Sequence, residues 1–306
     1  MASEGEDSPK LRYVQNPYIE TMDEDILFHL NMSTKTHNFK ELFGDVKFVC
    51  IGGSPSRMLT VAKYLAQELS YHVPSNFELT NMTKSSDRFV LYKVGPVISA
   101  SHGVGVPSMS VLLLELLKLL SHAEAKDVTL FRLGTSGGIG VEPGTVVVTS
   151  EPLNGLGMPK YEQIILGERV TSEAVLDEEL GDSIKNCQPA DLDFDVVRGK
   201  TICANDFYQE QGRVDGAICN HTEEDKFRYL EKLQKLGVRN FEMECVALAA
   251  ITRKVKLKAA VVCVTLLNRM KGDQVTTPHS TLTEYEKRPA MVVARYMLNE
   301  LQRQQN

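Results

Sequence analysis

Residues 128–149 read VTLFRLGTSGGIGVEPGTVVVT and place an arginine beside glycines and hydroxyl side chains. The apolar run 128–131 predicts a buried strand that delivers Arg132 and then breaks at the turn-forming sequence 134–138. Guanidinium, hydroxyl and backbone N–H groups in such a turn are the donors that a bound oxyanion needs, with Thr135 among them. The alternative is a structural β-turn with a surface arginine.

A second candidate anion site is the segment 52–57, GGSPSR, which follows an apolar run typical of a strand. Ser54 is a good helix N-cap and Pro55 suits the first helical position, so we expect a helix to begin here. Its free N–H groups, together with Arg57 in the first turn, would attract one small oxyanion such as phosphate. The spacing of a Walker loop is missing, and the alternative is a structural strand-to-helix turn.

A third motif, FYQEQGR at 207–213, carries groups suited to a planar heterocycle. Gln211 offers an amide that both donates and accepts, and Arg213 offers a planar fork of donors. The glycine between them lets the two side chains converge, and Phe207 could stack on the ring. A pyrimidine with carbonyl, N–H and carbonyl along one edge matches these groups. The alternative is a polar surface loop.

The fourth motif is FEMEC at 241–245, at a predicted strand-to-helix junction. Glu242 and Glu244 alternate, so in an extended segment both carboxylates point the same way. A carboxylate there can accept hydrogen bonds from two neighbouring sugar hydroxyls, and Met243 suits the apolar face of a ribose. Alternatively, Glu244 is a helix-start charge favoured by the helix dipole, and Met243 is a core residue.

Composition limits the classes of function open to the chain. The 306 residues are 42% hydrophobic and 24% charged, as in ordinary globular proteins, and the net charge of −6 argues against nucleic acid or anionic membrane partners. We expect no signal peptide, and we expect the apolar stretch 111–120 to be a core helix that does not span a membrane. Six cysteines without a CxxC pair indicate reduced thiols and a cytoplasmic location.

Strand-like and helix-like segments alternate, so we expect one α/β domain with a mixed central β-sheet flanked by helices. Residues 1–12 are expected to form a disordered tail and residues 13–306 the domain. The expected strands are 46–51, 89–92, 97–101, 128–131, 146–148, 201–204, 239–243 and 259–266. The expected helices are 55–71, one from about 108, 173–186, 221–236, 244–254 and 285–302, with an irregular stretch at 153–167.

Together these motifs resemble the nucleoside phosphorylase-I family and, within it, the animal-type uridine phosphorylases. The resemblance runs from about residue 22 to residue 289. Its most specific marks are GDVKFVCIGGSPSRM (44–58), RLGTSGGIG (132–140), DFYQEQGRVDGA (206–217) and VVCVTLLNR (261–269). It implies the fold of that family and, as its activity, the reversible phosphorolysis of uridine to uracil and ribose 1-phosphate in pyrimidine salvage.

The resemblance also implies three groups of site residues. Those implied for phosphate are Gly53, Arg57, Arg132 and Thr135, with Arg88 from a second subunit. Those implied for uracil are Phe207, Gln211, Arg213 and Arg269, with Leu266, Leu267 and Val275 on the apolar side. Those implied for ribose are Met243, Glu244 and Glu242, with His29 from a second subunit near the 5′-hydroxyl. Because two of these residues act in trans, the family picture requires at least a homodimer.

The segment 265–269, TLLNR, favours a pyrimidine over a purine substrate. Purine-cleaving relatives carry an aspartate in the loop after the last core strand, where it protonates the purine ring, and this segment holds no carboxylate. A departing uracil spreads its negative charge onto ring oxygens, which Arg213 and Gln211 can stabilise while Arg132 helps to orient phosphate. The scheme requires no metal and no organic cofactor. Three alternatives remain open: a phosphate-independent nucleosidase, a purine phosphorylase and a catalytically inactive nucleoside-binding paralogue.

Overall fold

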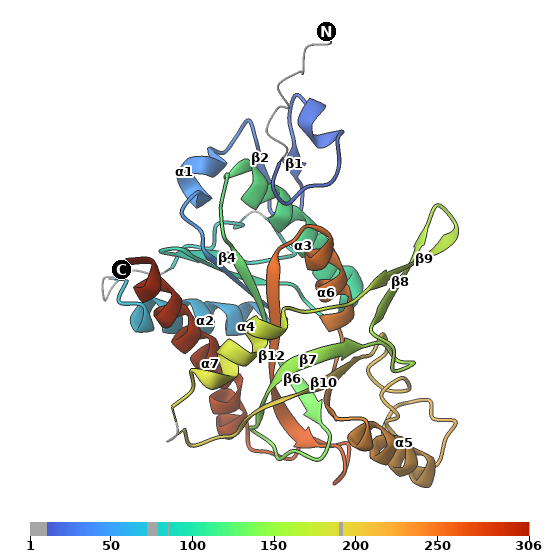
Figure 1. Ribbon diagram of the computed structural model, residues 1–306. Helices are drawn as coiled ribbons and strands as arrows, with labels where there is room; N and C mark the ends of the chain where they lie inside the picture. Colours follow the sequence, from blue (N-terminus) through green and yellow to red (C-terminus); the bar gives the residue numbers. More distant parts are fainter. Residues whose placement is uncertain (1–10, 72–78, 85, 190–191, 306) are drawn as a thin grey trace.

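The structure, a computed structural model, describes residues 11–71, 79–84, 86–189 and 192–305, so most of the predicted tail lies outside the described residues. Within that part of the chain, the central sheet has eight strands (Figure 1). They are β3 (Phe48–Gly52), β4 (Leu91–Val94), β5 (Val97–Ser101), β6 (Thr129–Gly138), β7 (Val146–Leu153), β10 (Val196–Cys203), β11 (Val238–Glu242) and β12 (Lys258–Asn268). Their order is β11-β10-β7-β12-β6-β3-β5-β4.

One half of the sheet closes on itself. Strand β11 pairs with β10 in parallel and also reaches β6 in an antiparallel pairing at Gly137 and Gly138. Strand β12 is parallel to β6 and antiparallel to β7. The strands β6, β12, β7, β10 and β11 therefore form a closed ring, while β3, β5 and β4 extend from β6 as an open wing. This closure brings β11 beside the end of β6.

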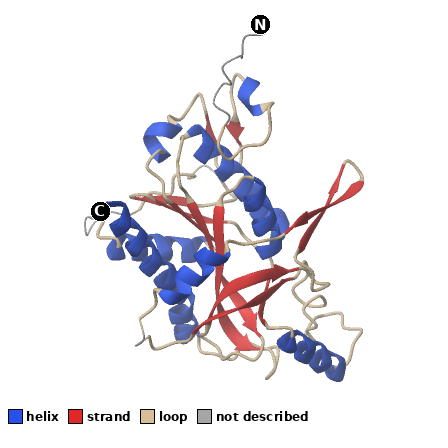
Figure 2. Ribbon diagram, viewed as in Figure 1, coloured by secondary structure: helices blue, strands red, loops and turns tan. Residues whose placement is uncertain are grey.

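Helices cover both faces of the sheet (Figure 2). One face carries α2 (Pro55–Glu68), α4 (Glu178–Asn186) and α7 (His279–Gln305), and the other carries α1 (Phe39–Phe43), α3 (Gly105–His122) and α6 (Cys245–Lys254). Alternate residues of a strand point to opposite faces, so Phe48 and Cys50 join one core while Val49 and Ile51 join the other. Helix α5 (Glu223–Lys235) packs on β11. The expected single α/β domain with a mixed central sheet is confirmed.

The apolar stretch expected as a core helix lies in α3. This helix has the length and composition of a membrane-crossing helix. However, Leu112, Leu113 and Leu116 are fully buried in the core that α3 shares with α1 and α6. Its apolar character is therefore accounted for, in large part, by packing inside the domain.

The prediction that β6 breaks after Arg132 was wrong. The strand continues through Gly134 to Gly138 and stays paired with β12 over its whole length. Glycine is needed at these positions because neighbouring atoms pack closely against the strand, and not because the chain turns there. A Cβ atom on Gly134 would overlap Nη1 of Arg132, and a Cβ on Gly138 would lie 3.0 Å from the carbonyl oxygen of Leu267. Glycine in a strand often marks such a crowded position.

The prediction of an irregular stretch at 153–167 was also wrong. Strands β8 (Lys160–Ile165) and β9 (Glu168–Glu173) form a hairpin that projects from the body (Figure 1). Leu166 and Gly167 both have positive φ, as in the tight two-residue turns of β-hairpins. Most of its side chains are exposed, so the sequence lacks the apolar alternation that announces a half-buried strand.

The remaining boundaries differ from the prediction mainly by length. Ser54 caps α2 as expected, accepting the N–H of Arg57. Helix α4 begins at Glu178, where Asp177 is the N-cap, and α7 begins at His279. A short 3-10 helix, Ile19–Thr21, and a hairpin of β1 (Ile26–Leu27) with β2 (Met32–Ser33) precede α1.

Candidate active site

A cavity of about 350 Å³ lies among the ends of β3, β5, β6 and β11 and brings most of the predicted site residues together. The predicted residues that line it are Gly53, Arg57, Arg132, Thr135, Phe207, Gln211, Arg213, Glu242, Met243, Glu244, Leu266, Leu267 and Val275. A larger cavity of about 390 Å³ lies near the start of β6, between Tyr13 and Tyr296, and holds none of the predicted residues. We therefore take the first cavity as the candidate active site because of the residues that line it, although it is the smaller of the two.

One end of this cavity, around Arg57, holds hydrogen-bond donors that lack an acceptor among the described residues. Arg57 in the first turn of α2 pairs through Nη2 with Glu286, at 3.0 Å, but its buried Nε has no hydrogen-bond partner among the described residues. The Gly53 backbone lies against Gly103, so that a Cβ on Gly53 would be 3.0 Å from the Gly103 carbonyl oxygen. Thr135 on β6 faces the same space. This arrangement suits a small oxyanion.

Arg132 is buried and held between two carboxylates. Its Nε lies 3.0 Å from Oε2 of Glu242, outside hydrogen-bond geometry, and its Nη2 donates to Oε2 of Glu244. Its Nη1 donates to Sγ of Cys263 at 2.9 Å. Burial alone would lower the pKa of Arg132, but Glu244 and Glu242 raise it well above the ordinary value. The guanidinium is therefore a fixed positive charge.

The carboxylates of Glu242 and Glu244 differ in their hydrogen-bond partners and in the direction of their pKa shifts. Glu242 is the last residue of β11. Its carboxylate accepts hydrogen bonds from the backbone N–H groups of Glu244 and Cys245, at the start of α6. Burial raises its pKa against the opposing effect of Arg132. Burial would also raise the pKa of Glu244, but Arg132 lowers it below the ordinary value. Glu244 accepts the N–H of Gly105 at 2.6 Å, and an ionised carboxylate retains capacity for further donors such as hydroxyls.

At the other end of the cavity, Gln211 and Arg213 lie on one loop and share a common support. Arg269 donates from Nη2 to the Gln211 carbonyl at 2.9 Å, and its Nη1 lies 3.4 Å from Oε1 of Gln211. The Arg213 guanidinium lies 4.5 Å from the Phe207 ring centroid. Arg269 is fully buried and does not line the cavity; it braces the loop from behind.

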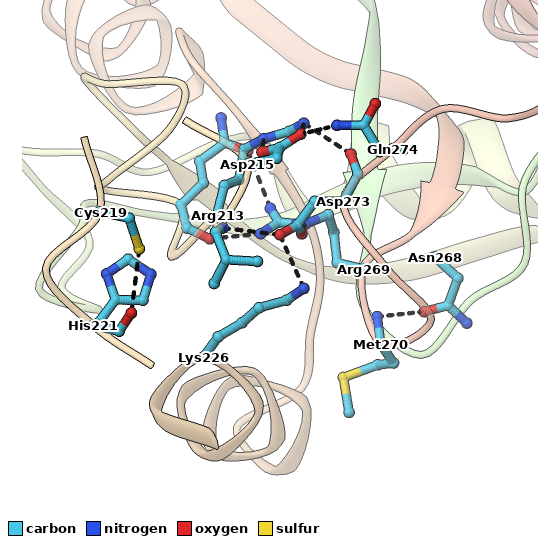
Figure 3. Close-up of polar contacts among 12 residues, drawn as sticks. Arg213, Asp215, Cys219, His221, Lys226, Asn268, Arg269, Met270, Asp273 and Gln274 are labelled. Carbon is cyan, nitrogen blue, oxygen red and sulfur yellow. Dashed lines mark hydrogen bonds and ion pairs between the residues drawn. The ribbon is translucent and has the colours of Figure 1, made fainter. Parts of the chain in front are cut away.

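Two aspartates that the sequence analysis did not single out fix the orientation of Arg213 (Figure 3). Asp215 accepts from Nε and Nη2 of Arg213 at 2.9 and 2.7 Å, which lowers the pKa of Asp215. The backbone carbonyl of Asp273 accepts from the same Nη2 at 2.8 Å. Nη1 is thereby left as the donor of Arg213 that is free to face the cavity.

Asp273 is the centre of this support. Its carboxylate accepts from Arg269 at 2.8 Å and from the Val214 N–H at 3.0 Å, and it pairs with Lys226 at 2.9 Å. Burial would raise the pKa of Asp273, but these three donors lower it. Figure 3 shows Lys226 reaching from α5 toward the carboxylate. The spacing of Asp215 two residues after Arg213 and of Asp273 four residues after Arg269 could have suggested both contacts, whereas Lys226 carried no such signal.

The sequence analysis also missed His102, which lines the oxyanion end of the cavity. Its side chain is 1% exposed, and neither ring nitrogen has a hydrogen-bond partner among the described residues. A buried polar atom without a partner costs about 1–3 kcal/mol. Burial lowers the pKa of His102 to about 4. Glu244 opposes this shift, and the guanidinium groups of Arg132 and Arg57 add to it.

The two residues predicted to act from a second subunit do not reach this chain's own cavity. His29 is hydrogen-bonded to Glu115 of α3, with Nδ1 and Oε1 2.7 Å apart. Arg88 is exposed, and its backbone N–H donates to the hydroxyl of Ser86, which in turn donates to the carbonyl of His29. His29 and Arg88 therefore lie on one common surface.

One group of potential metal ligands occurs among the described residues. Cys203, Glu242 and Cys245 place one ligand atom each within 4.8 Å of the others. All three residues are buried, and burial raises the pKa of the Cys245 thiol. Because the Glu242 carboxylate already accepts two N–H groups and faces Arg132, this group resembles a packed core cluster more than an open metal site.

Fold and site together define an α/β protein whose cavity can hold an oxyanion beside a planar polar ring. The family model described as the phosphorylase superfamily matches residues 47–297. The chain belongs to this superfamily.

Individual relatives are similar over nearly the whole chain. Uridine phosphorylase 1 of Mus musculus is 49% identical over 95% of this chain and 93% of its own length. The inactive uridine phosphorylase B of Schistosoma mansoni is 39% identical over 93% of this chain and 95% of its own length. A crystal structure of uridine phosphorylase from Schistosoma mansoni in complex with thymidine has a TM-score of 0.89 at 40% identity, covering 94% of this chain and 98% of that chain.

Substituting Gly134 tests whether the shape of β6 fixes Arg132. In Gly134→Ala the new methyl group overlaps Nη1 of Arg132, and it would also lie 3.1 Å from Sγ of Cys263. We expect the displaced guanidinium to weaken phosphate binding about 10- to 100-fold, as measured by isothermal titration calorimetry, because hydrogen bonds to charged groups are lost. Unchanged affinity in a folded variant would show that Arg132 does not contact the anion.

Proposed function

We propose that this chain is a pentosyltransferase that catalyses the reversible phosphorolysis of uridine to uracil and ribose 1-phosphate. The observation that carries the proposal is the composition of one cavity. The cavity is lined by Arg57 and Arg132, whose buried Nε atoms have no hydrogen-bond partner among the described residues, by the Glu244 carboxylate, and by Gln211 with Arg213. These are the groups needed for phosphate, for sugar hydroxyls and for a pyrimidine edge, in that order. The names of the similar proteins point to the same reaction.

The reaction follows from these positions. An oxygen of phosphate, oriented by Arg57 and Arg132, attacks C1′ of the nucleoside, while the bond from C1′ to N1 of uracil breaks. The sugar gains positive charge and uracil leaves with the bonding electron pair. Arg213 and Gln211 stabilise the negative charge that spreads over the uracil oxygens. Because Asp215 and Arg269 hold these groups in place before the substrate arrives, little reorganisation is needed during the reaction.

The cavity favours a pyrimidine base. Among the described residues that line it, the carboxylates are Glu242 and Glu244, and both are paired with Arg132. Asp273 is the acidic residue that follows 265–269 in sequence, but its carboxylate is committed to Arg269 and Lys226. No acid from this segment is therefore positioned to protonate a purine ring, which a uracil leaving group does not need.

A catalytically inactive nucleoside-binding protein is the second candidate, because one similar protein is named inactive uridine phosphorylase B. We measure uracil release from uridine with and without added phosphate, with inosine as the matched purine substrate. We expect release that depends on phosphate, and no hypoxanthine from inosine. Release without phosphate would identify a nucleosidase, and a folded protein that binds uracil without any turnover would support the inactive alternative.

Arg213 provides a test of the base end of the cavity. We expect Arg213→Ala to reduce turnover with uridine by about two to three orders of magnitude, because one donor to the developing negative charge is lost. The exposed Arg228 on α5 is the matched control, and Arg228→Ala should retain wild-type turnover. Thermal unfolding of both variants checks that they remain folded. Near-normal turnover of Arg213→Ala would exclude its proposed role.

We further propose a homodimer in which His29 and Arg88 complete the partner's site. Phe28 and Leu114 adjoin the hydrogen-bonded pair of His29 and Glu115, and their side chains are 76% and 52% exposed. Exposed apolar side chains beside ordered polar groups are typical of a protein interface. The free cysteines support the expected cytoplasmic location of this assembly.

Mixed dimers test the exchange of residues between subunits. Arg88→Ala and Arg132→Ala are expected to be inactive separately. If Arg88 acts in trans, a dimer of one Arg88→Ala chain and one Arg132→Ala chain holds one site with both arginines and one site with neither. About half of randomly paired dimers are of this mixed kind, so co-expression of the two variants should restore about a quarter of wild-type activity. Size-exclusion chromatography with light scattering confirms the dimer. A co-expressed mixture without activity, in dimers shown to contain both chains, would exclude action in trans.

A further inference from the structure

His102 occupies a position that the fold holds firmly. It follows the last residue of β5, and its backbone N–H donates to the carbonyl of Gly52 at 2.7 Å. The N–H of Gly103 donates to the carbonyl of Gly53 at 3.1 Å. These two bonds continue the pairing of β3 with β5 past the strand ends. The backbone of residues 102 and 103 is therefore fixed beside Gly52 and Gly53, and the His102 side chain lines the cavity near Arg57 and Arg132.

The groups around this imidazole leave its own nitrogens without partners. The charged groups that face it are Arg57, Arg132 and Glu244. A guanidinium only donates, so neither arginine can accept the ring N–H. Glu244 accepts from Gly105 and Arg132, and the ring makes no hydrogen bond to this carboxylate or to another group among the described residues. Since the ring is 1% exposed and both of its nitrogens lack a partner among the described residues, a ligand bound in the cavity can supply the missing partner.

We infer that His102 is a further phosphate ligand, whose ring N–H donates to an oxygen of the phosphate held by Arg57 and Arg132. This inference rests on the proposed function and adds a residue to its site. Phosphate supplies acceptors for every unpaired donor at this end of the cavity, which neither a sugar hydroxyl nor a base edge could do.

The charge state of His102 fits this role. With a pKa of about 4, the imidazole is neutral at neutral pH and keeps one donor and one acceptor nitrogen. A third positive charge beside Arg57 and Arg132 would be unfavourable in a buried site. A neutral ring instead adds a hydrogen bond to phosphate without adding charge repulsion, and its other nitrogen can accept a hydrogen bond from a protonated phosphate oxygen.

Two variants of His102 separate ligand binding from a purely structural role. His102→Phe removes both nitrogens and keeps a planar ring, and His102→Gln keeps a donor and an acceptor. The matched control is His221→Phe, because Nε2 of His221 is also buried with no hydrogen-bond partner among the described residues, and His221 does not line the cavity. For each protein we measure the KM for phosphate, the KM for uridine, and the melting temperature with and without phosphate.

For His102→Phe we expect the KM for phosphate to rise about 10- to 100-fold, with the KM for uridine unchanged. We expect its melting temperature without phosphate to equal or exceed that of the wild type, because unpaired buried nitrogens are replaced by an apolar ring. The rise in melting temperature on adding phosphate should shrink, because weaker binding gives less stabilisation. His102→Gln should recover part of the phosphate affinity, and His221→Phe should leave both KM values as in the wild type.

Other results would overturn the inference. An unchanged KM for phosphate in His102→Phe, or a rise confined to the KM for uridine, would show that the ring does not contact phosphate. A lower melting temperature without phosphate, together with unchanged KM values, would identify a structural histidine. If the wild type itself gains no thermal stability from phosphate and releases no uracil, the proposed function fails, and the inference fails with it.

Discussion

The buried ion cluster of Arg132 with Glu242 and Glu244 is the interaction on which the rest of the site depends. A buried guanidinium is tolerated only with close partners, and here the partners come from the end of β11 and the start of α6. The closure of the sheet brings β11 beside β6 and makes this meeting possible. Glu242 also accepts the first N–H groups at the α6 start, so the same carboxylate ties the helix to the strand.

Near this cluster lie buried polar groups whose missing hydrogen bonds lower the stability of the folded protein. Nε of Arg57 and the ring nitrogens of His102 are buried without a hydrogen-bond partner in the described part of the chain, and such groups raise the free energy of the folded state unless a partner binds. At the base end the opposite holds, because Asp215 and Asp273 satisfy and orient Arg213 before any ligand is present. On the proposed function, phosphate would complete the oxyanion end, whereas the protein itself completes the base end. Both arrangements place charge in advance where a reaction develops it.

Much of the architecture could be predicted from the sequence, because buried strands and amphipathic helices leave regular apolar patterns, as in β3 and β12. The run Gly134–Gly138 misled the prediction because glycine signals a turn by its local preference, whereas here it serves close packing in a strand. The hairpin β8–β9 was missed because it is exposed on both faces. His102 was missed because a lone histidine after a strand has no local pattern; only the fold brings it beside Arg57 and Arg132.

The most direct test of this account is a crystal structure of the protein with phosphate and uracil bound together. We expect phosphate to bind among Gly53, Arg57, His102 and Arg132, and uracil to bind against Gln211 and Arg213. The space between them should match one ribose, beside Glu244. Phosphate bound elsewhere, or uracil lying at the arginine cluster in place of phosphate, would contradict the assignment of the two ends of the cavity.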